Sequence, residues 1–235
     1  MTPRSEVSVA GGGELRGGTP AECDAVRLRD LVRGRHMPAR PSDLEGGRAT
    51  HMFQTRGSTL HSTMEYLARM LDDRACAELV GHLSPEARDA VQHAGVTDDV
   101  PYAIALELWR SADVALRDAN PRWAEDAGAE AIRVRGMQLY AGLLQKPTPL
   151  EFVTQHISLF QRYYRPGDMR VTDHAPGRAR ARLIGFEPGD RLFCRRLTGG
   201  WLAAINLAGG RESTVDHPRC SLEGDLFCEW EIKWK

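Results

Sequence analysis

Residues 191–234, RLFCRRLTGGWLAAINLAGGRESTVDHPRCSLEGDLFCEWEIKW, decide the fold class. A Pro-Gly-Asp cap precedes an expected helix over about 190–208, which ends at a Gly-Gly pair. Strands are expected over 211–217 and 226–234, because the second segment has the clearest two-residue periodicity in the chain. Its expected apolar face consists of Leu226, Cys228, Trp230, Ile232 and Trp234.

The segments before this stretch extend the pattern towards the N-terminus. Two short strands, 168–173 and 178–186, surround Pro176-Gly177. Further upstream, apolar periodicity and capping residues predict helices over 60–71, 73–82, from Ser84-Pro85 to about Gly95, and over 102–119, 122–145 and 149–164. The fold class is therefore α+β, with a helical N-terminal part packed on a four-stranded antiparallel sheet of the order ββ-α-ββ.

Residues 1–50 differ from the rest of the chain. The glycine-rich stretch 9–20 indicates flexible chain, and a short helix with many arginines is expected to follow it. The basic segment 27–40 either docks an anionic partner or is a solvated helix face. The chain thus divides into a flexible arm with a short basic helix, 1–50, and a domain, 51–235.

Length, composition and charge exclude several classes of protein. A chain of 235 residues with 42% hydrophobic and 27% charged residues suits one globular domain plus some extra chain. The formal net charge of -1 gives no reason to expect nucleic acid or a membrane surface as partner. Because neither a secretory signal nor a run of about 20 apolar residues is visible, a cytoplasmic location is expected.

Five cysteines are present, and this odd number argues against a disulfide framework. Cys220 and Cys228 are separated by seven residues, His217 lies three residues before Cys220, and Cys194 lies upstream. Three thiolates and one imidazole suit tetrahedral zinc. The alternative is that Cys194 and Cys228 are small buried apolar residues. No role is assigned to the other two cysteines, Cys23 and Cys76.

A family resemblance supports the zinc interpretation. The pattern Cys194-x4-Gly199, a helix closed by glycines, and Cys220-x7-Cys228 with an internal Gly224 resembles the end of the 4-vinyl-reductase small-molecule-binding domain. It is especially similar to the sensor domains of phenol-responsive transcriptional activators. In that family three cysteines and one acidic residue hold a structural zinc, so the resemblance implies that Cys194, His217, Cys220 and Cys228 do so here, with His217 at the acidic position. Four protein ligands leave no open position for metal-centred hydrolysis.

A second resemblance covers residues 52–234, where the order of features is similar to a family of uncharacterised myxobacterial proteins related to the haem-NO-binding and vinyl-reductase superfamily. It implies a ligand-binding domain of the NO-signalling and vinyl-reductase type, with a pocket between the sheet and the helices 122–164 and with a homodimer as one option. Polar-tipped aromatic side chains and one histidine are the candidate pocket residues, although each can equally be plain core or surface. These are His156, Phe160, Tyr163, Tyr164 and Trp201.

The leading functional hypothesis is a non-enzymatic sensor domain with a structural zinc, which binds a small hydrophobic or aromatic ligand and signals through an unidentified partner protein. The alternatives are a scaffolding module with a vestigial pocket and a haem-binding gas sensor. An enzyme acting on a tetrapyrrole vinyl group is the weakest reading, since no nucleotide motif is visible as a hydride source. His156 could be a proximal haem ligand, but a Tyr-x-Ser-x-Arg signature is missing, so haem is not expected.

Overall fold

The computed structural model describes residues 53–155 and 157–235. The expected arm over residues 1–50 lies outside the described residues, and so does the pocket candidate His156. The first described helices are α3 (Gly57–Met70), α4 (Asp73–His82), α5 (Pro85–His93) and α6 (Tyr102–Leu116). The helix α5 begins as its Ser-Pro signature predicts, because the Ser84 hydroxyl accepts a hydrogen bond from the Ala87 amide at 3.2 Å.

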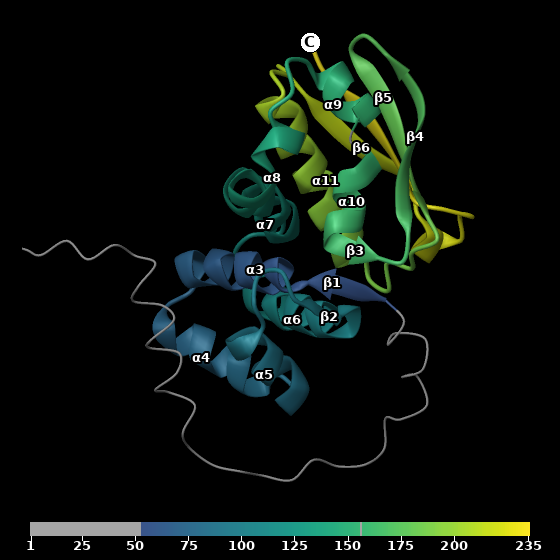
Figure 1. The fold of residues 1–235 in the computed structure, drawn as a ribbon. Coiled ribbons are helices and arrows are strands. Elements are labelled where there is room, and N and C mark those ends of the chain that lie inside the picture. Colours follow the sequence, from purple (N-terminus) through teal and green to yellow (C-terminus); the bar gives the residue numbers. More distant parts are fainter. Residues whose placement is uncertain (1–52, 156) are drawn as a thin grey trace, which may run out of the picture. The chain divides into compact units, whose positions relative to one another are not determined.

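A four-stranded antiparallel sheet forms the C-terminal part, as expected from the sequence. Its strands are β4 (Asp168–Ala175), β5 (Arg178–Ile184), β6 (Thr214–Arg219) and β7 (Glu229–Lys233), in the order β4-β5-β7-β6. The helix α11 (Arg191–Leu207) connects β5 to β6 and completes the ββ-α-ββ unit (Figure 1). The predicted α+β fold class is confirmed.

A second, smaller sheet has no signal in the sequence. Its strands are β1 (Gln54–Arg56), β2 (Asp99–Pro101) and β3 (Tyr164–Arg165), in the order β2-β1-β3. Strands of two or three residues are too short to show a two-residue periodicity. This sheet joins the beginning of the described chain to the segment just before β4.

The two long helices predicted over 122–145 and 149–164 are each divided. The first is α7 (Trp123–Ala131), a π-helix η1 (Ile132–Gly136) and α8 (Met137–Leu144), with a non-helical backbone at Tyr140 (φ -138°, ψ 29°). The second is α9 (Pro149–Gln155) and α10 (Ile157–Tyr163). A π turn keeps the helical hydrogen bonding but changes its spacing, so residue propensities do not reveal it.

The two faces of the four-stranded sheet differ in chemistry. On the inner face Ala181, Leu183, Trp230 and Ile232 are buried, and α9, α10 and α11 pack over this sheet. On the other face arginines of β5 pair with glutamates of β7, as in Arg182–Glu229 at 2.8 Å and Arg180–Glu231 at 3.3 Å. Alternation along β5 and β7 therefore separates core from solvent.

The predicted apolar face of segment 226–234 needs one correction. Leu226 is 96% exposed, and Trp234 is only partly buried. The strand begins at Glu229, so Leu226 lies in the preceding turn, where strand alternation no longer fixes its direction.

The helices α7 and α11 approach each other closely at two glycines. A Cβ atom on Gly128 would lie 2.0 Å from the Arg196 carbonyl oxygen, and one on Gly199 would lie 1.8 Å from the Glu125 carbonyl oxygen. These distances leave no room for a side chain, so the two backbones touch directly. Among the described helices, none is long and apolar enough to cross a membrane.

Candidate functional site

Three segments bring the predicted metal ligands together. Cys194 lies in the first turn of α11, His217 lies on β6, and Cys220 and Cys228 flank the connection from β6 to β7. That connection contains a short 3-10 helix, η2 (Ser221–Glu223), followed by Gly224 with a φ of 96°, a left-handed conformation that glycine adopts readily. The Asp225 carboxylate closes the loop by accepting a hydrogen bond from the Cys220 amide at 2.8 Å.

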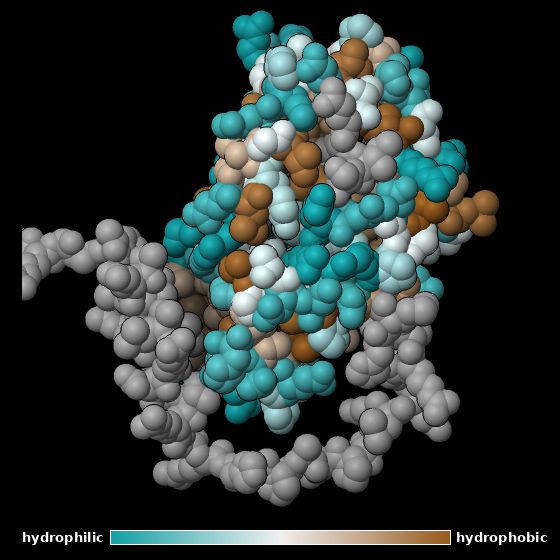
Figure 2. Space-filling model, viewed as in Figure 1, coloured by the Kyte–Doolittle hydropathy of each residue, from teal (hydrophilic) through white to brown (hydrophobic). Residues whose placement is uncertain are grey.

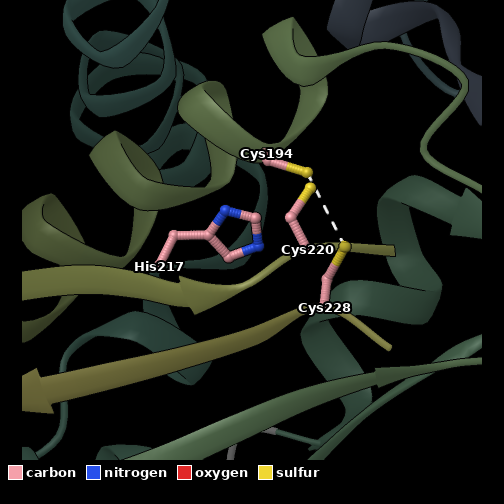
Figure 3. A group of neighbouring side chains, drawn as sticks. All are labelled: Cys194, His217, Cys220 and Cys228. Atoms are coloured by element: carbon pink, nitrogen blue, oxygen red, sulfur yellow. Dashed lines mark hydrogen bonds between the residues drawn. The ribbon is translucent and has the colours of Figure 1, made fainter. Parts of the chain in front are cut away.

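The donor atoms of this cluster have the spacing of a tetrahedral metal site. The three sulfur atoms face one another, with the His217 imidazole beside them (Figure 3). The sulfur atoms of Cys194 and Cys228 lie 3.8 Å apart, and all four donor atoms lie within 4.8 Å of one another. Zinc–sulfur bonds of about 2.3 Å in a tetrahedron place two sulfur atoms about 3.8 Å apart. The residues present therefore fit zinc in both number and spacing.

Burial and electrostatics distinguish the cluster from an ordinary group of core cysteines. Each of the three cysteines is only 1% exposed. Hydrogen bonds from Cys194 and Ser221, together with the nearby His217 imidazole, lower the pKa of Cys228, whereas the hydrogen bond to Cys228 and burial raise the pKa of Cys194. The His217 ring stacks on Trp230 at 4.4 Å between centroids, and its buried Nε2 has no hydrogen-bond partner among the described residues. Three buried cysteine sulfur atoms and one unpartnered imidazole nitrogen are the groups that a soft divalent cation would satisfy.

A cavity of about 60 Å³ lies between η1, α10, β4 and α11. Four of the five candidate pocket residues line it, namely Phe160, Tyr163, Tyr164 and Trp201, while His156 lies outside the described residues. The other lining residues are Ile132, Leu159, Met169, Leu197, Gly200 and Ala204. Sequence reasoning missed these six because small and apolar side chains look the same in a cavity wall and in a filled core.

The walls of this cavity are mainly apolar, and their polar side-chain atoms belong to Tyr163, Tyr164 and Trp201. The Tyr163 hydroxyl is buried and has no hydrogen-bond partner among the described residues. Burial, together with the neighbouring Tyr140 and Tyr164, raises the pKa of Tyr163, so this hydroxyl stays protonated at neutral pH. A buried hydroxyl without a partner carries a desolvation cost that a suitably placed ligand atom would offset.

A dense aromatic cluster lies next to the cavity. Tyr164 packs against Phe160, Phe186 and Phe193, with ring centroids 5.2 to 5.6 Å apart, and Tyr102 joins the same group. Tyr102 donates a hydrogen bond to the Pro188 carbonyl at 2.7 Å. These rings fill the interior where the helices α6 and α11 meet β3.

One charged side chain is buried beside the aromatic cluster. Arg196 on α11 is 5% exposed, and its guanidinium carbon lies 4.8 Å from the centroid of the Trp109 ring. Burial lowers the pKa of Arg196 to about 10, which still leaves the group charged at neutral pH. None of the carboxylates in residues 53–155 and 157–235 forms an ion pair with it.

The exposed apolar side chains lie on separate elements. On the face shown in Figure 2, apolar residues are scattered among hydrophilic ones. The most exposed are Met70, Val114, Val134, Leu207, Leu222 and Leu226. Single exposed apolar residues of this kind are usual on soluble domains and do not define a docking face.

Comparisons with known proteins give a likeness in structure. No protein-family model and no curated protein matches the sequence. The H-NOX protein from K. algicida in the Fe(II) unliganded state is similar with a TM-score of 0.60 and 9% identity, over 77% of this chain and 96% of that chain. The H-NOX protein from S. oneidensis in the Fe(II)NO state gives 0.57 and 12%, over 77% and 99%. A structure from a study of heme distortion in the H-NOX family gives 0.57 and 8%, over 77% and 95%.

This likeness shows the fold, which is that of H-NOX proteins. It also corrects one expectation. The absence of a Tyr-x-Ser-x-Arg signature in the sequence argues against haem, but the similar structures include H-NOX proteins in Fe(II) and Fe(II)NO states. The expectation against haem is therefore wrong, because the structures that share this fold include one from a study of heme distortion in the H-NOX family.

Proposed function

We propose that the described part of the chain is a sensor domain that holds a mainly apolar ligand between α10, η1 and α11. The observation that carries this proposal is the apolar cavity with its single unpartnered hydroxyl, that of Tyr163. An apolar enclosure with one convergent polar group is typical of small-molecule sites. The H-NOX fold supports the proposal, since proteins of that fold are described with an iron-bound gas ligand.

Haem is the first candidate ligand. When bound, haem supplies an iron that takes up a small gas molecule such as NO. Leu159, Phe160 and Trp201 would offer it apolar contact surface, and the chemistry of these walls fits a porphyrin. The cavity of about 60 Å³ is smaller than the roughly 300 Å³ of ordinary ligand pockets. A haem-bound form therefore requires α10 and η1 to pack further from α11 than they do here.

The haem candidate is tested by titrating the purified full chain with hemin under reducing conditions. We expect saturation near one equivalent, a sharpened Soret band, and a band shift when NO is added. His156→Ala should abolish the NO-sensitive spectrum. His174→Ala, which changes a histidine on β4, is the matched control and should leave the spectrum unchanged. Unsaturable hemin binding, or the same spectrum in both variants, would contradict a specific haem site with His156 as its ligand.

A compact single-ring molecule is the second candidate, and the size of the cavity favours it. An engineered cavity of about 150 Å³ accepts benzene, so a ring of that size needs only local side-chain movement here. Thermal shift with a panel of single-ring aromatics should give stabilisation that grows with ligand concentration. Ala204→Leu, which fills the cavity, should remove this response, while Gly142→Ala, where a new Cβ has no neighbour within 4 Å, should keep it.

We also propose that Cys194, His217, Cys220 and Cys228 hold a structural zinc ion. The 3.8 Å separation of two sulfur atoms and the unpartnered Nε2 of His217 favour this assignment. The ion would join the beginning of α11 to the β6–β7 turn. Metal analysis of the purified protein should give close to one zinc per chain; a value well below that, with all four thiols of the described region reduced and reactive, would overturn the assignment.

The wider signalling role is a proposal that rests on the sequence alone. It includes a homodimer, a separate partner protein, a domain beginning near residue 51, and a kinship with 4-vinyl-reductase domains through the Cys194, Cys220 and Cys228 pattern. Light scattering of the full chain measures its molar mass and so shows whether it is a homodimer. A chain lacking residues 1–50 should keep ligand and zinc binding if the arm serves only a partner.

A further inference from the structure

Arg196 is the one arginine of the described region that is buried without a carboxylate. It is 5% exposed, and its Nη1 has no hydrogen-bond partner among the described residues. By contrast, its neighbour Arg195 forms a bidentate pair with Glu125, at 2.9 and 2.7 Å. The two adjacent arginines thus differ in that only Arg195 has a counter-charge.

An unpaired buried charge is costly, so its surroundings matter. The side chains that interact electrostatically with the Arg196 guanidinium are three tyrosines, Tyr66, Tyr102 and Tyr164, and its guanidinium lies over Trp109. Aromatic faces and hydroxyl groups stabilise a cation only in part. Removing an arginine head group from water without an anion leaves most of the desolvation cost in place.

The position of Arg196 connects it to the proposed ligand site. Tyr164 belongs to both environments, because its ring lines the cavity and its hydroxyl interacts with Arg196. Leu197, the next residue along α11, also lines the cavity. None of the residues that line the cavity is charged, and Arg196 is not one of them, so its link to the cavity runs through Tyr164 and Leu197.

We propose that Arg196 is the anion-binding group of this site, so that the ligand combines an apolar ring with a carboxylate. The proposal deepens the proposed function and rests on it. The ring occupies the cavity lined by Phe160 and Trp201, and the carboxylate accepts a hydrogen bond from the unpartnered Nη1 of Arg196. A guanidinium matches a carboxylate in geometry as well as in charge.

The test uses two probes of the same shape and different charge, benzoate and benzamide, titrated calorimetrically into the full chain. The wild-type protein should bind benzoate at least roughly tenfold more tightly than benzamide, as expected for a charge-assisted hydrogen bond. Arg196→Met should reduce this preference to less than about threefold. Arg196→Lys, which keeps the charge, should retain part of it. Arg191→Met, which changes an exposed arginine on the same helix, is the control and should keep the full preference.

The melting temperature provides a second readout. An arginine without a partner can be replaced by an apolar side chain of similar length at little cost, so Arg196→Met should melt at or above the wild-type temperature. Equal affinity for both probes, or a preference that survives in Arg196→Met, would overturn the role of Arg196 while leaving the ligand site intact. If neither probe binds the wild-type chain, both this inference and the compact-ligand candidate fail. Haem then remains as the candidate ligand, and the hemin titration tests it.

Discussion

The helix α11 takes part in two sites that are fixed by different physical means. At its first turn Cys194 meets three other donor atoms, all within 4.8 Å of one another. Further along, Leu197, Gly200, Trp201 and Ala204 form one wall of an apolar cavity. The cluster of three cysteines and one histidine is defined by a few directional donor atoms, whereas the cavity is defined by the space that many side chains leave unfilled.

This difference shows which parts of a site can be predicted from a sequence. Cys194, His217, Cys220 and Cys228 are rare residue types at short spacing, so the sequence predicts their convergence. Cavity walls such as Ile132 and Met169 are common residue types, and their meeting depends on how η1 and β4 pack. A directional site should therefore fail abruptly on substitution, while the cavity should respond gradually.

The largest expected effect is loss of the metal cluster. Cys220→Ser should lower bound zinc to near zero and cost at least about 3 kcal/mol of stability, or roughly 10 °C in melting temperature, because metal binding and folding are coupled. Metal analysis and calorimetry measure the two effects. Cys76→Ala changes a buried cysteine on α4, outside the cluster, and should keep one zinc per chain. An unchanged melting temperature for Cys220→Ser would show that the cluster has no structural role.

The second largest change in stability is expected at the backbone contact between α7 and α11. Gly199→Ala places a Cβ atom 1.8 Å from the Glu125 carbonyl oxygen, so α7 and α11 must separate, at a cost of about 3 kcal/mol. Gly142→Ala, with no neighbour within 4 Å, should instead stabilise α8 by about 0.5 to 1 kcal/mol. Chemical denaturation compares the pair. Similar stabilities for the two variants would mean that the close approach of α7 and α11 is not maintained in solution.

A smaller change in stability, this time an increase, is expected for a substitution in the cavity wall. Tyr163→Phe removes a buried hydroxyl without a partner and should raise stability by about 1 kcal/mol, while weakening ligand-induced stabilisation. Tyr140→Phe, whose ring packs against Tyr163, is the matched control and should leave both quantities near wild type. A marked loss of stability in Tyr163→Phe would indicate that the hydroxyl has a partner in solution.

The smallest effect concerns the turn between the cluster cysteines. Leu226 is 96% exposed, so Leu226→Ser should change stability by less than about 0.5 kcal/mol and leave zinc in place. Thermal melting with metal analysis checks both. A drop of several degrees would restore the sequence-based placement of Leu226 on the buried face of the strand.

The sequence predicted the ββ-α-ββ unit because its strands and helix have clear periodicity and caps. The Asp190 side chain, for example, accepts a hydrogen bond from the Leu192 amide at 3.0 Å and begins α11 where expected. The π turn of η1 was not predictable, since Ile132–Gly136 has the composition of an ordinary helix. The three-stranded sheet was missed because β3 consists of only two residues.

The sequence predicts some of the candidate site residues and not others, for a related reason. The aromatic members of the cavity wall were named because their size and polar tips mark them, and four of them do line one cavity. Arg196 escaped notice because an arginine in a sequence gives no sign of burial, least of all next to the paired Arg195. Haem was dismissed on one missing motif, although the architecture that such a motif accompanies is present.

The direct backbone contact at Gly128 and Gly199 has a consequence for how a signal could leave the domain. At these two glycines no side chains lie between the backbones of α7 and α11, so we expect this pair of helices to move little when a ligand binds. Any displacement caused by a ligand must then appear in the elements that face this pair across the cavity, α10 and η1. We therefore expect the outer side of α10 and η1 to move when the ligand binds, and distance measurements between spin labels on α10 and on α4 should detect this movement.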